Sequence, residues 1–131
     1  MSYSISSLDE LGQGYGFRKV RQPLGVTAFG VNALIFPPGY EGPNHYHDHQ
    51  DELYFVHRGT AIFSFDGVEH EVGEGGLVHV ESTTHRMITN RTADDLVLFI
   101  VGGKGGYVER DGQVVTAEDL AKRVAMKEMQ Q

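Results

Sequence analysis

Short runs of strand-forming residues, separated by glycine, recur along most of this chain and constrain its fold more than any other feature. The runs are rich in Val, Ile, Phe, Tyr and Thr, and 17 glycines punctuate the chain. They return roughly every eight to twelve residues, a spacing typical of an all-β sandwich or barrel. The candidate strands are residues 26–36, 53–57, 60–65, 68–72, 77–80, 85–90 and 96–101.

Two local signals indicate how successive strands are joined. Asp66-Gly67 supplies the two positive-φ residues of a type I′ turn, so it predicts an antiparallel hairpin. Pro37-Pro38-Gly39 ends the strand before it, because proline cannot donate a hydrogen bond to a neighbouring strand. Strands in this number close to remove exposed edges, so we expect an all-β barrel or two-sheet jelly roll rather than an open sheet.

The 131 residues are expected to form one domain, long enough to bury roughly two thirds of the unfolded surface around a single core. We expect residues 21–110 to form the barrel. Residues 116–128 predict a short C-terminal helix, with Thr116 as N-cap and with Leu120 and Val124 on one face. For residues 1–20 two interpretations stay open, an added edge strand or an arm that crosses to a second subunit. Because such barrels have edges to cover, we expect a homodimer.

Composition excludes several classes of protein. Without cysteine the chain forms neither a disulfide nor a thiolate metal site, so any metal is held by nitrogen and oxygen. The 18 acidic and 11 basic residues give a net charge of −7, which repels a phosphate backbone, and we expect no nucleic-acid partner. No segment approaches the roughly 20 apolar residues of a membrane helix, and the N-terminus lacks the pattern of a signal peptide. We therefore expect a soluble, cytoplasmic protein without a membrane partner.

Residues 39–59 gather side chains that one metal ion can bind. His45 and His47 are two apart, so on an extended strand both project from the same face, about 7 Å apart along the backbone. Glu52 begins an apolar run, and a bend at residues 48–50 would turn its carboxylate toward the same pocket. The structural alternative is a solvated loop, which also contains the weaker candidate His49.

The same segment resembles the first motif of the cupin superfamily. Gly39, His45, His47, Glu52 and Gly59 reproduce its glycine, five residues, HxH, four residues, glutamate, six residues and glycine. The chain is thus similar to small, single-domain, cupin-2-like conserved barrel proteins. This resemblance implies a cupin-type jelly-roll β-barrel, the double-stranded β-helix, whose interior often holds a divalent transition metal.

The second cupin motif, which supplies another histidine in that family, is matched less well. An ungapped alignment on Gly75 and Asn90 puts Arg86 at the ligand position, one residue after His85. The motif's acidic residue, proline and second glycine are replaced by Gly76, Glu81 and Thr83.

Two registers are open here, because a one-residue shift sends a strand side chain to the opposite face. If the turn before His85 is one residue short, His85 points inward and completes a site of three histidines and one glutamate, with open positions on a six-coordinate ion. If the register is the usual one, Arg86 points inward, repels a cation by several kcal/mol and suits an anion. We favour His85 as a metal ligand, since arginine tolerates solvent better at a barrel rim, and keep Arg86 as a candidate substrate-binding residue.

The side chains after Glu52 are expected to alternate between the two faces of a strand. Tyr54 and Val56 are expected on the inward face with Glu52, and Leu53 and Phe55 on the opposite face. Tyr54 is a candidate to donate its hydroxyl to a bound substrate. Its structural alternative is a core aromatic residue whose hydroxyl has a partner within the protein.

These residues support functions from different classes. The first is a metal-dependent enzyme that acts on a small oxygen-bearing organic molecule, since the superfamily includes dioxygenases, isomerases and lyases; Mn, Fe, Co, Ni, Cu and Zn all accept such ligands. Neither the catalytic group nor the reaction follows from the residues. The second is a non-catalytic barrel that binds a small ligand without metal, with Arg86 in the pocket. A third is a structural dimer whose former site has decayed.

Overall fold

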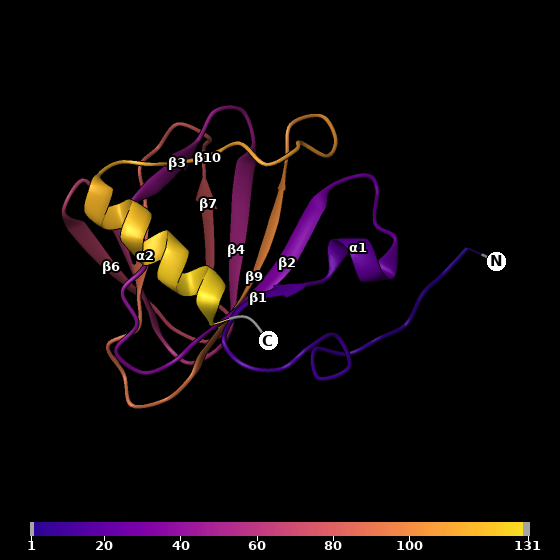
Figure 1. Ribbon diagram of the computed structural model, residues 1–131, viewed down its shortest axis with the longest axis horizontal. Coiled ribbons are helices and arrows are strands. Elements are labelled where there is room, and N and C mark those ends of the chain that lie inside the picture. Colours follow the sequence, from indigo (N-terminus) through magenta and orange to yellow (C-terminus); the bar gives the residue numbers. More distant parts are fainter. Residues whose placement is uncertain (1, 130–131) are drawn as a thin grey trace.

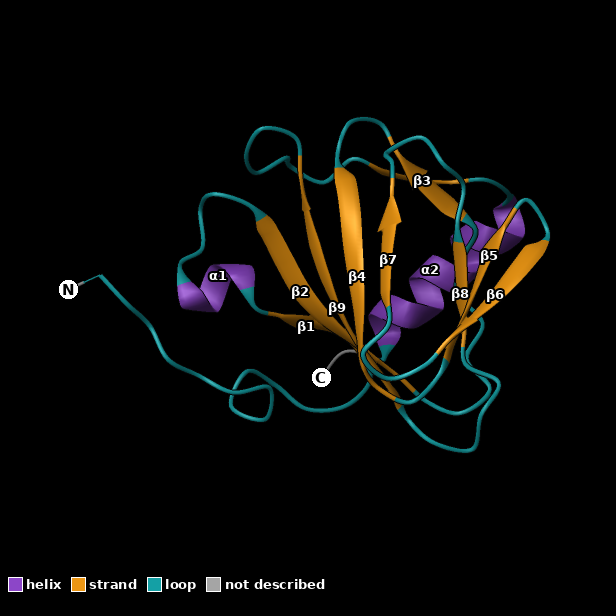
Figure 2. Cartoon of the chain, turned by 180° about the vertical axis from the view of Figure 1, so that it is seen from behind, coloured by secondary structure: helices purple, strands orange, loops and turns teal. Residues whose placement is uncertain are grey.

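Residues 2–129, described by a computed structural model, form ten strands in two layers, a five-stranded sheet and a second layer of a three-stranded and a two-stranded sheet, with a C-terminal helix beside them (Figure 1, Figure 2). The strands are β1 (Gly16–Lys19), β2 (Gly30–Phe36), β3 (His45–His47), β4 (Asp51–Arg58), β5 (Ala61–Phe65), β6 (Val68–Val72), β7 (Leu77–Val80), β8 (Met87–Thr89), β9 (Leu96–Gly103) and β10 (Gly112–Val114). The helices are α1 (Arg21–Leu24) and α2 (Ala117–Glu128).

The strands pair antiparallel throughout the described residues. The larger sheet has the order β1-β2-β9-β4-β7. In the second layer, the bridge between His45 and Arg86 joins β3 of the pair β10-β3 to the residue before β8 of the sheet β6-β5-β8, and Glu41, before β3, forms a bridge with Thr89 of β8. Two layers of antiparallel strands of this kind are a jelly roll. The predicted fold class, an all-β barrel with a short C-terminal helix, is therefore confirmed.

Most predicted strands are present with nearly the predicted bounds. The seven correspond to β2, β4, β5, β6, β7, β8 and β9, although β2 begins at Gly30 and not at residue 26. The hairpin is confirmed, because Asp66 and Gly67 have φ angles of 50° and 81° and the flanking residues pair. The pattern missed β3 and β10, which are three residues long and pair with each other.

Gly59, the last glycine of the predicted motif, follows β4 and allows the chain to turn into β5. Its φ of +82° lies in the left-handed region that side chains disfavour, and a Cβ at this position would lie 2.6 Å from the carbonyl oxygen of Asp95. Backbone packing, rather than chemistry, therefore requires glycine here.

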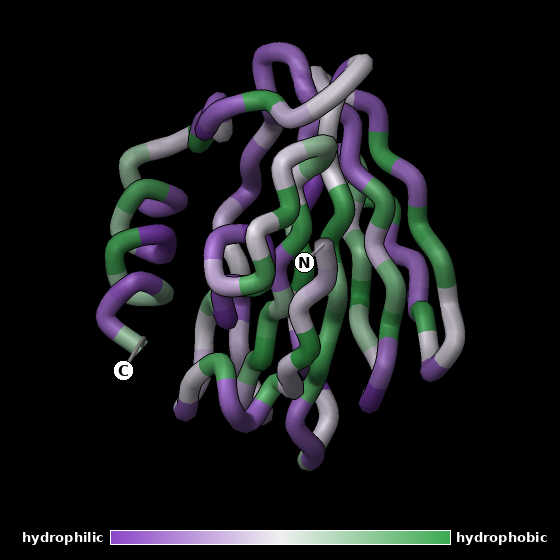
Figure 3. Tube along the Cα trace, turned by 90° about the vertical axis from the view of Figure 1, so that its right-hand side faces the viewer, coloured by the Kyte–Doolittle hydropathy of each residue, from purple (hydrophilic) through white to green (hydrophobic). Residues whose placement is uncertain are grey.

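β4 shows how the two faces of the larger sheet divide. Tyr54 and Val56 are 1% and 0% exposed, whereas Leu53 and Phe55 are 42% and 37% exposed. The predicted parity is thus confirmed, with Glu52 buried on the inward face. Figure 3 shows apolar and polar residues alternating along the strands. The inward residues that pack around Tyr54 and Val56 include Leu34, Phe36, Tyr40, Ala61, Phe63, Val80, Ile88, Leu96 and Leu98.

The two ends of the chain add to the barrel. β1 pairs with β2 as an edge strand, which is one of the two interpretations of residues 1–20, and the residues before it extend away from the barrel in Figure 1. Residue 1 lies outside the described residues. The C-terminal segment crosses to the second layer, where β10 pairs with β3.

Helix α2 begins where the sequence predicts. The Thr116 hydroxyl accepts a hydrogen bond from the Asp119 N–H, and the Asp119 carboxylate accepts one from the Thr116 N–H, which makes a capping box. Met126 packs against the core, whereas Leu120 and Val124 are 45% and 48% exposed. No helix among residues 2–129 is long and apolar enough to cross a membrane.

Candidate metal centre

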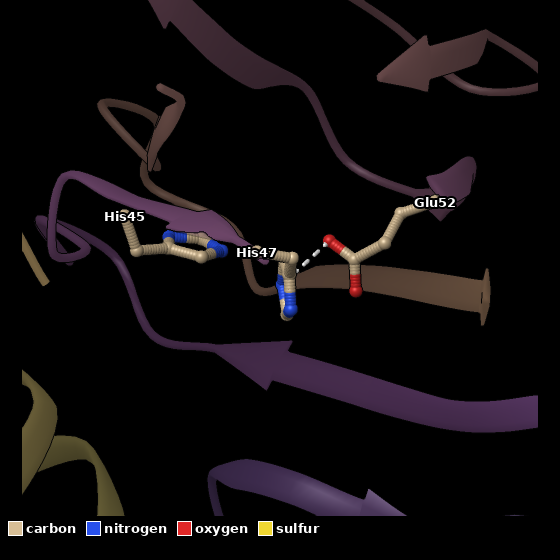
Figure 4. A group of neighbouring side chains, drawn as sticks. All are labelled: His45, His47 and Glu52. Carbon is tan, nitrogen blue, oxygen red and sulfur yellow. Dashed lines mark ion pairs between the residues drawn. The ribbon is translucent and has the colours of Figure 1, made fainter. Parts of the chain in front are cut away.

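Three potential metal ligands meet on the inward faces of β3 and β4. β3 carries His45 and His47 at alternate positions, and Glu52 is the second residue of β4. Each side chain offers one ligand atom, and these atoms all lie within 4.8 Å of one another. Figure 4 shows the three side chains pointing toward one another, with His47 Nε2 3.2 Å from Glu52 Oε1.

β3 holds its two histidines in place through neighbours on both sides. On one side β10 pairs with it, with Gly112 opposite His47 and Val114 opposite His45. On the other side His45 and Arg86 exchange both backbone hydrogen bonds, at 2.9 and 2.8 Å. Directly opposed residues of an antiparallel pair project from the same face. The bridge therefore puts the Arg86 side chain on the inward face with His45.

His45 is held as a neutral imidazole with one ring nitrogen free. Its Nδ1 lies 3.1 Å from the carbonyl oxygen of Pro43, and because a carbonyl only accepts, Nδ1 carries the proton and Nε2 is left unprotonated. Burial lowers the pKa of His45 to about 4. The ring is therefore neutral at pH 7, as a metal ligand must be.

His47 and Glu52 form a coupled pair. Burial disfavours the charged form of each, but the hydrogen bond and charge between them outweigh it, so the pKa of His47 is raised and the pKa of Glu52 is lowered. The Tyr54 hydroxyl also donates to Glu52 Oε1, at 2.6 Å. Tyr54 is buried and has a partner within the protein, which is the arrangement of its structural alternative.

Arg86, and not His85, occupies the interior beside these ligands. Arg86 is 0% exposed, and its NH2 nitrogen lies 3.9 Å from Glu52 Oε1. His85 is on the other face, where its ring stacks on Tyr46 with ring centroids 4.8 Å apart. The favoured register is thus corrected: the bridge to His45 fixes Arg86 inward, and the short turn that would have turned His85 inward does not occur.

The Arg86 guanidinium is anchored by the loop before it. NH1 donates to the carbonyl of Ser82, and NH2 donates to those of Glu81 and Val80. Its Nε has no hydrogen-bond partner within residues 2–129. A buried donor without a partner is costly, so Arg86 is held in the interior at an energetic cost.

Asp111 is a site residue that the sequence did not reveal. It lies just before β10, and its Oδ1 accepts a hydrogen bond from His47 Nδ1 at 2.8 Å. Asp111 stands 64 residues from His47, and no motif surrounds it. Only the pairing of β10 with β3 brings the two together, so no local signal could have identified it.

The donor set fits a divalent transition metal. Two imidazole nitrogens and one carboxylate oxygen suit manganese, iron, cobalt, nickel, copper and zinc. The Arg86 charge opposes a cation, and the Glu52 and Asp111 carboxylates offset it. The residues therefore fit a metal held by three protein ligands, more weakly than it would be with a fourth histidine in place of Arg86.

Comparison with known proteins identifies the family. A family model described as the cupin domain matches residues 33–102. A 4-hydroxy-3-methylbut-2-enyl diphosphate reductase of Bacillus pumilus is 37% identical over 89 residues, which cover 60% of this chain and 27% of the relative. The chain thus spans about a quarter of that curated relative, whose activity belongs to the longer protein.

Solved structures show the same fold. A sugar phosphate isomerase of the cupin superfamily from Silicibacter pomeroyi is similar with a TM-score of 0.64 and 25% identity, covering 78% of this chain and 68% of that one. A cupin protein from Bacteroides fragilis is similar with a TM-score of 0.67 and 20% identity, and the match covers 88% of this chain and 99% of that one. The family match spans more than half of the chain and agrees with the jelly roll around His45, His47 and Glu52. The chain therefore belongs to the cupin family.

Proposed function

We propose that this cupin binds a divalent transition metal through His45, His47 and Glu52 and uses it to bind a small oxygen-bearing organic molecule. The observation that carries the proposal is the convergence of three ligand atoms, within 4.8 Å of one another, on the inward face of the barrel. Two nitrogens and one carboxylate leave positions open on a six-coordinate ion, where a substrate oxygen can bind.

The protonation of two of the three ligands, His45 and Glu52, supports this proposal. His45 is neutral at pH 7 with Nε2 unprotonated, and Glu52 is ionised because its pKa is lowered. Both groups are thus in the form that binds metal without a proton first being lost. We propose His45 Nε2, His47 Nε2 and one Glu52 oxygen as the ligand atoms.

The class of reaction is a further part of the proposal. A metal that polarises a bound oxygen serves isomerases and lyases, and one that binds dioxygen serves dioxygenases. The similar fold of a sugar phosphate isomerase, at 25% identity, favours a substrate with several oxygen atoms. Arg86 adds a fixed positive charge beside the metal ligands, which favours an anionic substrate.

Elemental analysis of protein purified without added metal tests the proposal. We expect close to one transition-metal ion per chain, or uptake of one Mn²⁺ or Zn²⁺ in a titration, and loss of binding in His47→Ala. His49→Ala is the matched control, because His49 continues the same alternation but is exposed and lies outside the ligand group. Equal metal content in both variants, or no uptake by the wild type, would contradict the proposal.

A second candidate function is a metal-free barrel in which Arg86 binds an anion. It is favoured by one observation, the Arg86 Nε that lacks a hydrogen-bond partner within residues 2–129. In that case the barrel binds a small carboxylate equally well in the presence and absence of EDTA, and Arg86→Met abolishes binding. The homodimer and the cytoplasmic location stay predictions from the sequence.

A further inference from the structure

The Asp111 carboxylate makes an unusually complete set of hydrogen bonds to the segment that carries the ligands. Its Oδ1 accepts from His47 Nδ1 at 2.8 Å and from Gln50 Nε2 at 2.7 Å. Its Oδ2 accepts from the backbone N–H groups of His49 and Gln50, at 2.7 and 3.0 Å. One side chain therefore ties the bend after β3 to the C-terminal segment and also contacts a metal ligand.

His47 lies between two carboxylates, one at each ring nitrogen. Asp111 Oδ1 is 2.8 Å from Nδ1, and Glu52 Oε1 is 3.2 Å from Nε2. A neutral imidazole carries one proton, and either carboxylate can accept a hydrogen bond from the nitrogen that holds it. If the proton is on Nε2, that nitrogen has no lone pair for a metal. The two carboxylates thus favour opposite tautomers, of which one binds metal through Nε2.

We propose that Asp111 is a positioning residue, which keeps the His47 proton on Nδ1 and so leaves Nε2 free to bind the metal. The shorter contact to Asp111 favours this tautomer over the one that Glu52 favours. The inference rests on the proposed metal site for its effect on affinity, but not for its effect on the imidazole. A carboxylate hydrogen-bonded to a metal-bound histidine also fixes the ring orientation and makes the other nitrogen a better ligand.

The fold places Asp111 at His47 through backbone pairing that does not depend on the side chain. The residue after Asp111, Gly112, stands directly opposite His47 in the β10–β3 pair. The Asp111 carbonyl also accepts a hydrogen bond from the Asp48 N–H at 3.2 Å. A change of the Asp111 side chain therefore leaves these backbone contacts available.

Nitrogen NMR of the metal-free protein tests the tautomer directly. At a pH where the His47 ring is neutral, we expect the proton on Nδ1 in the wild type and on Nε2 in Asp111→Ala. In Asp111→Asn the amide oxygen can still accept from Nδ1, so we expect the wild-type tautomer to be retained at least in part. The same tautomer in wild type and Asp111→Ala would overturn the proposal, whatever the protein does with metals.

Metal titration then tests whether Asp111 raises the affinity of the site for metal. With Mn²⁺ or Zn²⁺ as the probe, we expect the Kd to rise about 10- to 100-fold in Asp111→Ala. Asp48→Ala is the matched control, because Asp48 lies on the same bend and its carboxylate accepts a hydrogen bond from Gln113 Nε2 at 3.0 Å, whereas the His47 ring has Asp111 and Glu52 as its partners. An equal loss in both variants would show that the bend, and not the imidazole contact, matters.

The two experiments separate this inference from the proposed function. If the wild type binds no metal, the proposed function fails, and the NMR result still decides the role of Asp111. If the wild type binds metal and the tautomer does not change, only the inference fails. Should Asp111→Ala not fold, Asp111→Asn decides the case, because an amide oxygen accepts more weakly than a carboxylate and the fraction of His47 rings protonated on Nδ1 should fall. Gln50→Ala is its control, since it removes one Asp111 contact but not that to His47. An unchanged fraction in Asp111→Asn, or an equal fall in Gln50→Ala, would contradict the proposal.

Discussion

The two halves of the site, residues 39–59 and residues 75–90, were both predicted by comparison with cupin motifs, but the structure treats their histidines differently. In the first half the spacing predicts the geometry, because His45, His47 and Glu52 converge as expected. In the second half it is the alignment without a gap, and not the presence of a histidine, that predicts which side chain points inward. Arg86 takes that position and His85 stacks on Tyr46 outside.

The difference shows what sets the direction of a side chain on a strand. A histidine one residue away from the ligand position cannot replace a ligand, because moving it would require every pair along the strand to shift. The bridge between His45 and Arg86 prevents such a shift. The second half therefore supplies a cation where the family motif has a ligand, and the two halves of the centre have opposite charges.

Removing the negative charge of Glu52, in residues 39–59, should have the largest effect on stability. In Glu52→Gln the buried Arg86 guanidinium loses the carboxylate 3.9 Å away, and we expect the free energy of unfolding to fall by about 3 kcal/mol. Urea denaturation in EDTA measures this without a contribution from metal. Glu81→Gln is the control, since Glu81 is exposed, and it should change stability by less than about 0.5 kcal/mol. A similar loss in both would mean that the opposite charges do not interact.

Restoring a histidine to the second half should raise metal affinity. In Arg86→His an imidazole replaces the cation at the inward position, and we expect Zn²⁺ to bind about 100-fold more tightly, since one unit of charge repulsion at short range costs several kcal/mol. Isothermal titration measures the change. Arg86→Met separates the two causes, because it removes the charge without adding a ligand. Unchanged affinity in both variants would show that the guanidinium does not influence the bound ion.

The helix cap that anchors the C-terminal segment should have a smaller effect. Burial opposes ionisation of Asp119, but hydrogen bonds from the Asn44 N–H and from Thr116 outweigh it and hold the pKa of Asp119 below its usual value. Asp119→Asn should therefore lower the free energy of unfolding by about 1 kcal/mol at pH 7. Since the folded pKa is the lower one, this difference is complete above pH 3.8 and disappears as the pH falls through the folded pKa.

Urea denaturation from pH 7 down to pH 2 checks the expectation for Asp119. Glu118→Gln is a suitable control, because its side chain is 82% exposed and its contact with Lys122 is 4.0 Å long. Little change is expected in that variant at any pH. A loss in Asp119→Asn that stays constant down to pH 2 would contradict the assigned role of the carboxylate.

The smallest effect should come from the histidine outside the barrel. His85→Ala removes a ring that stacks on Tyr46, so we expect a loss of less than about 1 kcal/mol in stability and no change in metal affinity. Denaturation and metal titration of the same preparation measure both. A clear loss of metal in this variant would return His85 to the ligand set and overturn the register described above.

Local patterns were enough to predict most of the fold. The hairpin at Asp66-Gly67 and the alternation along β4 follow from turn geometry and from the two-residue period of a strand, both of which involve neighbours in sequence. β3 could not be predicted in this way, because its three residues are strand only through their contacts with β10 and Arg86.

The residues of the candidate site likewise differ in whether neighbours in sequence or strand pairing bring them together. His45, His47 and Glu52 lie within eight residues of one another, so their spacing carries the information. The ungapped motif alignment also places Arg86 at the ligand position. Asp111 reaches the site only through the pairing of β10 with β3, 59 residues from Glu52 in the chain, which a single sequence does not disclose. An approach that ranks residues by motif therefore finds the three ligands and Arg86, and misses Asp111.

The family match ends at residue 102, before β10 and α2 begin. A fragment cut at that boundary would keep every proposed ligand but lose the strand that covers the outer edge of β3, which would then be free to pair with a neighbouring molecule. Transplanting the centre into another barrel would meet the same difficulty. The shortest segment that would keep this site intact is consequently longer than its recognisable motif, because it includes β10 and the first turn of α2.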